Sequence, residues 1–208
     1  MLSACSKNGD LSSWLDNVFE EKYEQCHANN YTDYIQYYLP SDIQEYDCDA
    51  LSYSFGIGSN EFIMNINVSE IINSKYYSDN FLNEDGFFDE TKLIYNHDGL
   101  YENINGESIN YFFKVYKYDD CFVLHMCSRE VNIYGRCFNE SDVALLASKF
   151  YQMAIYSNVE NDKIIAAYSS KDVVDYSKNP INLFETNLPL NGKIDDILIV
   201  DKEEVPDN

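Results

Sequence analysis

Apolar residues alternate with small or polar ones across residues 51–68, which predicts a β-hairpin. A turn at Ser59-Asn60 aligns the alternating apolar positions of 51–57 with those of 62–68. The opposite face then carries serine, glycine, asparagine and Glu61, with Ile63 as its apolar exception. An antiparallel pair with one buried side shows this alternation, so this hairpin is expected to cover a core.

A second alternating segment, 111–128, predicts another hairpin that turns at Asp119-Asp120. One face is apolar and is expected to be buried. The other face is mixed, and a two-residue turn would place Lys114 opposite His125 on it. We therefore expect the second face to be partly covered.

Two stretches repeat apolar residues at helical spacing, and they predict amphipathic helices at 12–28 and 140–157. Asp10 or Ser12 is suited to cap the first helix. The run Asn139–Asp142 is typical of a helix start and precedes the second.

The remaining elements are predicted from caps, turns and short apolar runs. They are a short helix capped by Thr32 and ended by Pro40, a helix at 70–77, and strands near 92–95, 99–104, 172–176 and 181–186. Residues 163–168 fit a helix or a strand.

The pattern as a whole predicts an α+β fold, in which an antiparallel sheet of hairpins packs against amphipathic helices. No repeat or Pro- or Gly-rich linker divides the chain, so 11–200 is expected to form one domain. Residues 1–10 are interpreted as a separate N-terminal segment, and 201–208 as an acidic flexible tail.

Charge narrows the classes of partner. The chain of 208 residues has 36 acidic and 14 basic residues, for a formal net charge of −22. Affinity for nucleic acid comes largely from Lys and Arg at phosphates, so nucleic-acid binding is disfavoured, as is adsorption to an anionic membrane. The acidity favours a basic partner, a cation or solubility alone.

The N-terminal segment contains Leu2-Ser3-Ala4-Cys5, followed by the polar run Ser6–Asp10. Leu2–Cys5 resembles the lipobox of bacterial lipoproteins, in which an aliphatic and two small residues precede a cysteine. The resemblance implies that Cys5 is the lipidation site and that the domain is held outside the cell membrane by acyl chains. The basic and apolar regions of a signal peptide would lie before Met1. The alternative is a cytosolic protein with an ordinary cysteine at position 5.

The cysteines offer weak catalytic candidates. Cys121 and Cys127 lie six residues apart on one predicted strand, about 20 Å at 3.3 Å per residue, so they cannot form a disulfide with each other. Cys127 shares a face with His125, which could act as its base. Buried thiols are the expected role of most of the six cysteines, and the His125–Cys127 pair is most simply explained by packing.

No cofactor or metal site is predicted. An EF-hand alignment on Gly86 puts Phe81 at the first ligand position and fails, and an irregular calcium site at Asp85, Asp89 and Glu90 is less favoured than a solvated turn. Phe55–Gly58 contains a Gly-x-Gly, but it lies within a strand and lacks the third glycine.

Three functional hypotheses follow. The first is a membrane-anchored, extracytoplasmic bacterial lipoprotein that binds a protein, a peptide or another envelope component. The second is a cytosolic acidic binding protein of the immunity or inhibitor type. The third is a cysteine-dependent enzyme that uses Cys127 and His125.

Overall fold

Two antiparallel sheets and four α-helices make up the described part of the chain in the computed structural model, which confirms the α+β class. The structure describes residues 10–21, 23, 26–76 and 88–170. The predicted strands at 172–176 and 181–186 and the tail at 201–208 lie outside these residues.

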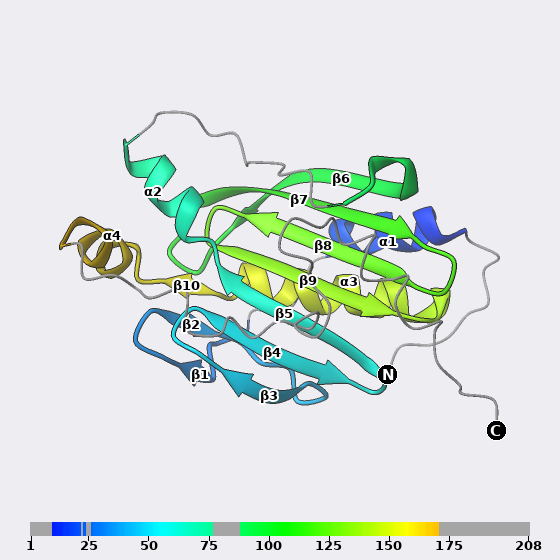
Figure 1. Ribbon diagram of the computed structural model, residues 1–208, viewed down its shortest axis with the longest axis horizontal. Helices are drawn as coiled ribbons and strands as arrows, with labels where there is room; N and C mark the ends of the chain where they lie inside the picture. Colours follow the sequence, from blue (N-terminus) through cyan, green and yellow to red (C-terminus); the bar gives the residue numbers. More distant parts are fainter. Residues whose placement is uncertain (1–9, 22, 24–25, 77–87, 171–208) are drawn as a thin grey trace, which may run out of the picture.

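The larger sheet has seven strands in the order β3-β4-β5-β9-β8-β7-β6 (Figure 1). In chain order they are β3 (Gln44–Cys48), β4 (Ser52–Ile57), β5 (Asn60–Ile66), β6 (Leu93–Glu102), β7 (Ser108–Lys117), β8 (Phe122–Ser128) and β9 (Val131–Cys137). All neighbouring strands pair antiparallel, with β9 joining the two predicted hairpins.

Both predicted hairpins are confirmed. Phe55 pairs with Phe62, so the apolar positions of β4 and β5 share a face as expected. The turn itself is one residue earlier than predicted, because Ile57 pairs with Asn60 and Gly58 supplies a positive φ of 62°. In the second hairpin Lys114 lies opposite His125, as the two-residue turn requires.

The two short strands predicted near 92–95 and 99–104 are instead the single strand β6. The sequence His97-Asp98-Gly99 reads as a turn but continues the strand opposite β7. Gly99 is needed for close packing there, because a Cβ atom at this position would lie 2.7 Å from the ring of Tyr111. The Asn105-Gly106 turn does connect β6 to β7, with Gly106 at φ 77°.

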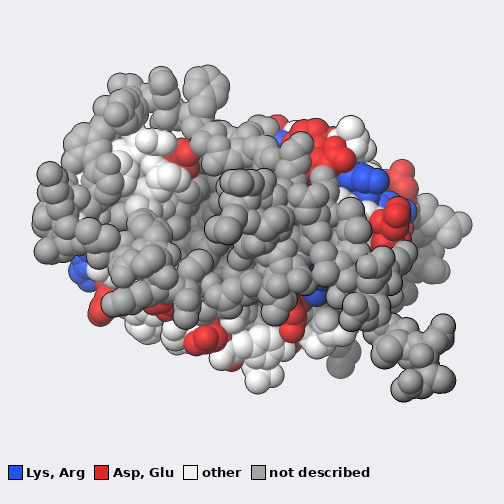
Figure 2. Space-filling view, in the orientation of Figure 1, with Lys and Arg blue, Asp and Glu red and all other residues white. Residues whose placement is uncertain are grey.

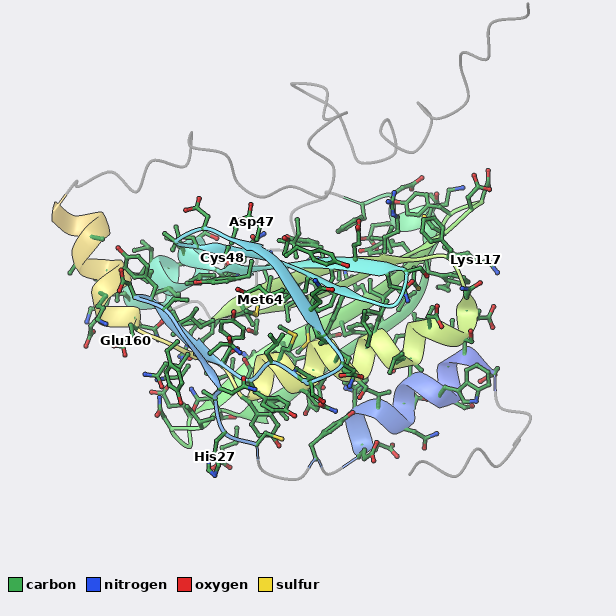
Figure 3. The ribbon with its side chains drawn as sticks, turned by 90° about the horizontal axis from the view of Figure 1, so that it is seen from below. His27, Asp47, Cys48, Met64, Lys117 and Glu160 are labelled. Atoms are coloured by element: carbon green, nitrogen blue, oxygen red, sulfur yellow. The ribbon has the colours of Figure 1, made fainter. Side chains whose placement is uncertain are left out.

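Helices α1 (Leu11–Glu20) and α3 (Glu140–Ile155) cover one face of the larger sheet (Figures 1 and 3). Asp10 caps α1 by accepting a hydrogen bond from the Ser13 N–H at 2.9 Å. Met64 lies between the sheet and α3 and is completely buried (Figure 3). This inner face, with both helices, forms the main core.

Helix α1 is shorter than the predicted 12–28. The backbone becomes extended at Glu21, and Tyr23 folds back so that its hydroxyl donates to the Val18 carbonyl at 2.9 Å. The Tyr23 ring packs on Tyr151 of α3, with ring centroids 5.7 Å apart. Tyr23 therefore packs its ring against α3 without continuing the helix.

The prediction of a short helix between Thr32 and Pro40 is wrong. Residues there form β1 (Asn30–Tyr31) and β2 (Ile35–Tyr37), which pair with β10 (Asn158–Val159) in a three-stranded sheet. Thr32 closes the β1–β2 turn by donating its N–H to the Ile35 carbonyl at 2.9 Å. Pairing with β10, more than 100 residues away, decided this local conformation.

Helices α2 (Val68–Tyr76) and α4 (Asn161–Ser170) contact each other at the end of the large sheet away from α1 (Figure 1). Helix α2 matches the predicted 70–77 helix. The undecided stretch 163–168 lies within α4. The β7–β8 turn lies at the end of the larger sheet near α1, and the β6–β7 and β8–β9 turns lie at the opposite end (Figure 1).

Candidate functional site

The sheet face opposite α1 and α3, here called the outer face, carries the catalytic candidates. It is formed by alternating residues of β7, β8 and β9 around His125. The His125 ring stacks on Tyr134 with centroids 4.5 Å apart and meets Phe112 edge-on at 4.9 Å. Phe88, which precedes the 3-10 helix η1 (Glu90–Lys92), packs against the same imidazole with ring centroids 5.4 Å apart. An aromatic cage therefore surrounds the imidazole.

Burial makes His125 a poor base. Its side chain is 6% exposed, and burial lowers its pKa to about 4; the nearby Lys114 charge lowers it further, while Asn132 opposes the shift. The Nε2 atom lies 2.8 Å from the Asn132 Oδ1, and Asn132 in turn donates to the Tyr134 hydroxyl. Because an amide oxygen only accepts, Nε2 carries the proton of a neutral ring.

Cys127 is held by polar contacts of its own. It is 2% exposed, and its Sγ accepts a hydrogen bond from Asn67 Nδ2 at 3.5 Å. A thiolate here would need a desolvated negative charge beside a histidine that resists protonation. The pair thus shares the predicted face, but both side chains are buried and burial favours the neutral imidazole.

Lys114 brings a positive charge onto the same face. Its Nζ lies 3.6 Å from the Glu90 carboxylate and 5.3 Å from the Phe112 ring centroid. Tyr116 also donates to Glu90, at 3.2 Å. Of the calcium candidates, Asp89 caps η1 and Glu90 pairs with Lys114, while Asp85 lies outside the described residues.

Other cysteines in the described ranges are free of disulfides. Cys121 and Cys137 are buried, Cys26 is half-buried and Cys48 is exposed. Burial raises the pKa of Cys137 to about 12 and also raises that of Cys121. Cys5, the predicted lipidation site, is outside the described residues.

Sequence reasoning missed a polar cluster where the β6–β7 and β8–β9 turns meet. Arg129 bridges two carboxylates, Glu107 at 2.9 Å and Glu130 at 3.4 Å. Asn103 donates to both of these carboxylates, at 3.4 and 3.3 Å. The residues come from separate hairpins, so the sequence offered one signal alone, that Arg129 is one of two arginines.

Glu130 is the most constrained member of this cluster. It is 1% exposed, and its Oε2 has no hydrogen-bond partner among the described residues. Burial raises its pKa, and the Arg129 charge and the Asn103 hydrogen bond only partly offset this. Its backbone amide bonds to Ser128 Oγ and its carbonyl accepts from Asn67, which locks the turn in place.

A shallow hollow of about 250 Å³ adjoins this cluster, between the β6–β7 turn and the end of α3. It is lined by Glu102, Asn103, Ile104, Gly106, Ile155 and Tyr156. Asn103 belongs to both the hollow and the carboxylate cluster. The cluster thus braces the turn that forms one wall of the hollow.

The described residues contain no cluster of three metal-ligating side chains. Their helices are also too short or too polar to cross a bilayer. Comparison with known proteins finds neither a family model nor a curated protein that matches this chain.

Proposed function

We propose that this protein is a lipid-anchored domain on the extracytoplasmic side of a bacterial membrane, and that it binds a partner rather than catalysing a reaction. The Leu2-Ser3-Ala4-Cys5 match carries the proposal, with Cys5 as the acylated residue. Two or three acyl chains on one cysteine provide stable anchoring, which a single chain does not.

The start of the domain supports a close attachment. Helix α1 begins at Leu11 with its cap at Asp10, so residues 6–9 are the only spacer between Cys5 and the cap. Five chain steps span at most about 18 Å. An acylated Cys5 would therefore hold the α1 end of the domain near the bilayer and leave the turn cluster at the far end.

Binding is favoured over catalysis by the state of His125 and Cys127. Both are buried, and the imidazole has a pKa of about 4, so it cannot readily accept the thiol proton near neutral pH. The acidic surface suits binding of a basic partner: Figure 2 shows Asp and Glu side chains along the margins of the visible face, with fewer Lys and Arg.

The test is mass spectrometry and detergent partition of the protein recovered from its own cells. We expect an N-terminal peptide that begins at a diacylglyceryl-modified Cys5, and a protein that enters the detergent phase. Cys5→Ala should move it to the aqueous phase, whereas the control Cys48→Ala, at an exposed cysteine, should not. An uncleaved, unmodified N-terminus in the soluble fraction would contradict anchoring and favour the cytosolic acidic binding protein.

A further inference from the structure

The two edges of the seven-stranded sheet differ in how well they are protected against added strands. Strand β3 has five residues, is broken by a bulge between Glu45 and Asp47, and carries both of these acidic side chains. Bulges, charges and short length are the devices that stop edge strands from pairing. The β3 edge is thus blunted.

Strand β6 at the other edge is longer and more regular. It has ten residues, its register irregularity lies at one end between Leu93 and Tyr95, and from Tyr95 to Glu102 its register with β7 is unbroken. It is the last strand in the sheet order, so no described strand lies beyond it. Leu100 is 64% exposed and Ile94 45% exposed, so these side chains are open to solvent. A long, regular, partly apolar edge is a template for another strand.

The backbone of β6 presents its hydrogen-bonding groups in the required pattern. The Asn103 N–H donates to the Glu107 carbonyl, which marks a hydrogen-bonded pair next to the turn. Hydrogen-bonded and non-hydrogen-bonded pairs alternate along an antiparallel ladder. The residues whose N–H and C=O groups point away from β7 are therefore Asn96, Asp98, Leu100 and Glu102.

The negative charge of the β6 edge indicates which kind of strand would pair with it. Asp98 and Glu102 lie exposed on this edge, and the chain carries a net charge of −22. Two β6 strands of separate copies would bring these carboxylates together, which disfavours self-pairing. An extended segment with basic side chains meets complementary charge and can place apolar side chains beside Leu100.

From these observations we infer that β6 is a docking edge for a basic, extended peptide segment of a partner protein, which adds as an eighth antiparallel or parallel strand. This deepens the proposed function, since it names the surface and the partner class of the binding domain. Main-chain hydrogen bonds supply affinity, and alternating side chains supply selectivity.

The experiment uses the full, unacylated chain and a fluorescent peptide of alternating lysine and valine, about seven residues long to match a typical strand, measured by anisotropy at low salt. We expect saturable binding that weakens about tenfold or more when alternate peptide amides are N-methylated, because these cannot donate to β6. An alternating glutamate and valine peptide should bind about tenfold more weakly or worse, because its charge matches that of the edge.

Variants locate the site. Asp98→Lys should weaken binding about fivefold or more, whereas Asp47→Lys, a matched exposed acidic residue on the β3 edge, should change it less than about twofold. Hydrogen exchange should show the amides of Asn96, Asp98 and Leu100 slowing about tenfold or more on saturation. This readout does not depend on either variant folding.

Three results would overturn the inference: N-methylated peptide binding as tightly as its parent, β6 amides already protected in the free monomer, or their protection only in a dimer detected by sedimentation. The outcomes are separate from the anchoring test. An acylated Cys5 with no β6 protection would leave an anchored domain that binds elsewhere, and β6 protection with an unmodified Cys5 would leave the edge without the anchor.

Discussion

Gly135 of β9 lies against Phe150 of α3, and replacing it tests the packing of the sheet on its helix. A Cβ atom at this position would lie 2.5 Å from the Phe150 Cζ and 2.9 Å from the Phe62 Cβ. Phe62 is completely buried on β5, and its Cβ is fixed to the backbone of a paired strand. Phe150 must therefore move, inside a close-packed core.

Gly135→Ala is expected to lower the free energy of unfolding by about 1–2 kcal/mol. Inserting a methyl group into a tight core costs roughly 1–3 kcal/mol. Replacing glycine also removes unfolded-state entropy, which recovers about 0.4–1 kcal/mol. The net loss corresponds to a fall in Tm of roughly 2–8 °C for a chain of this size.

Urea unfolding followed by Trp14 fluorescence measures this change, since Trp14 is the single tryptophan and lies on α1. A double-mutant cycle with Phe150→Leu identifies the cause. Removing ring atoms should cost less in the Gly135→Ala background than in the parent, with a coupling of about 1 kcal/mol.

Gly106→Ala is the matched control. It also loses stability, by about 1 kcal/mol, because of its φ of 77°, but its nearest contact would be Glu102 at 3.5 Å. It should therefore show no coupling to Phe150→Leu. Equal or greater stability of Gly135→Ala, or additive effects with Phe150→Leu, would refute the packing argument.

Three further predictions concern buried ionisable groups. The pKa of His125 in the folded state, about 4, lies below its ordinary 6.5, so this residue should lower the free energy of unfolding progressively as pH falls from 6.5 to 4, by up to about 3 kcal/mol. His125→Gln should flatten the dependence of the urea-derived free energy of unfolding on pH in that range, and an unchanged dependence would contradict the argument. Pulsed iodoacetamide labelling with mass spectrometry should modify exposed Cys48 much faster than Cys127, and equal rates would argue for a reactive Cys127. Because the pKa of Glu130 is raised in the folded state, this residue should lower the free energy of unfolding as pH rises past the pKa of the unfolded chain, and Glu130→Gln should be at least as stable as the parent at mildly alkaline pH. Glu130→Ala leaves the Asn103 amide without this acceptor and should lose roughly 1–3 kcal/mol. Similar stability of the two variants would contradict the role of that hydrogen bond.

Alternation and helical spacing were enough to predict the elements that line the main core. The hairpins at 51–68 and 111–128 and the helix at 140–157 match β4–β5, β7–β8 and α3 because each buries one continuous apolar face. The pairing of Lys114 with His125 followed from turn length alone. Local patterns therefore determined the fold class and the face on which each catalytic candidate lies.

Contacts between distant segments decided what the local patterns could not. Thr32 precedes a strand because β10 pairs with β2, and α1 ends early because Tyr23 docks on α3. The Arg129–Glu130 cluster and the open β6 edge depend on strand order, which periodicity does not encode. The tertiary structure also decided against His125 as a base for Cys127, because burial favours the neutral imidazole. Hydrophobic periodicity and helix caps specify which residues form an element, because those signals act between residues close together in the sequence. The order of the strands, the identity of the edge strands and the burial of side chains arise only when distant parts of the chain pack together.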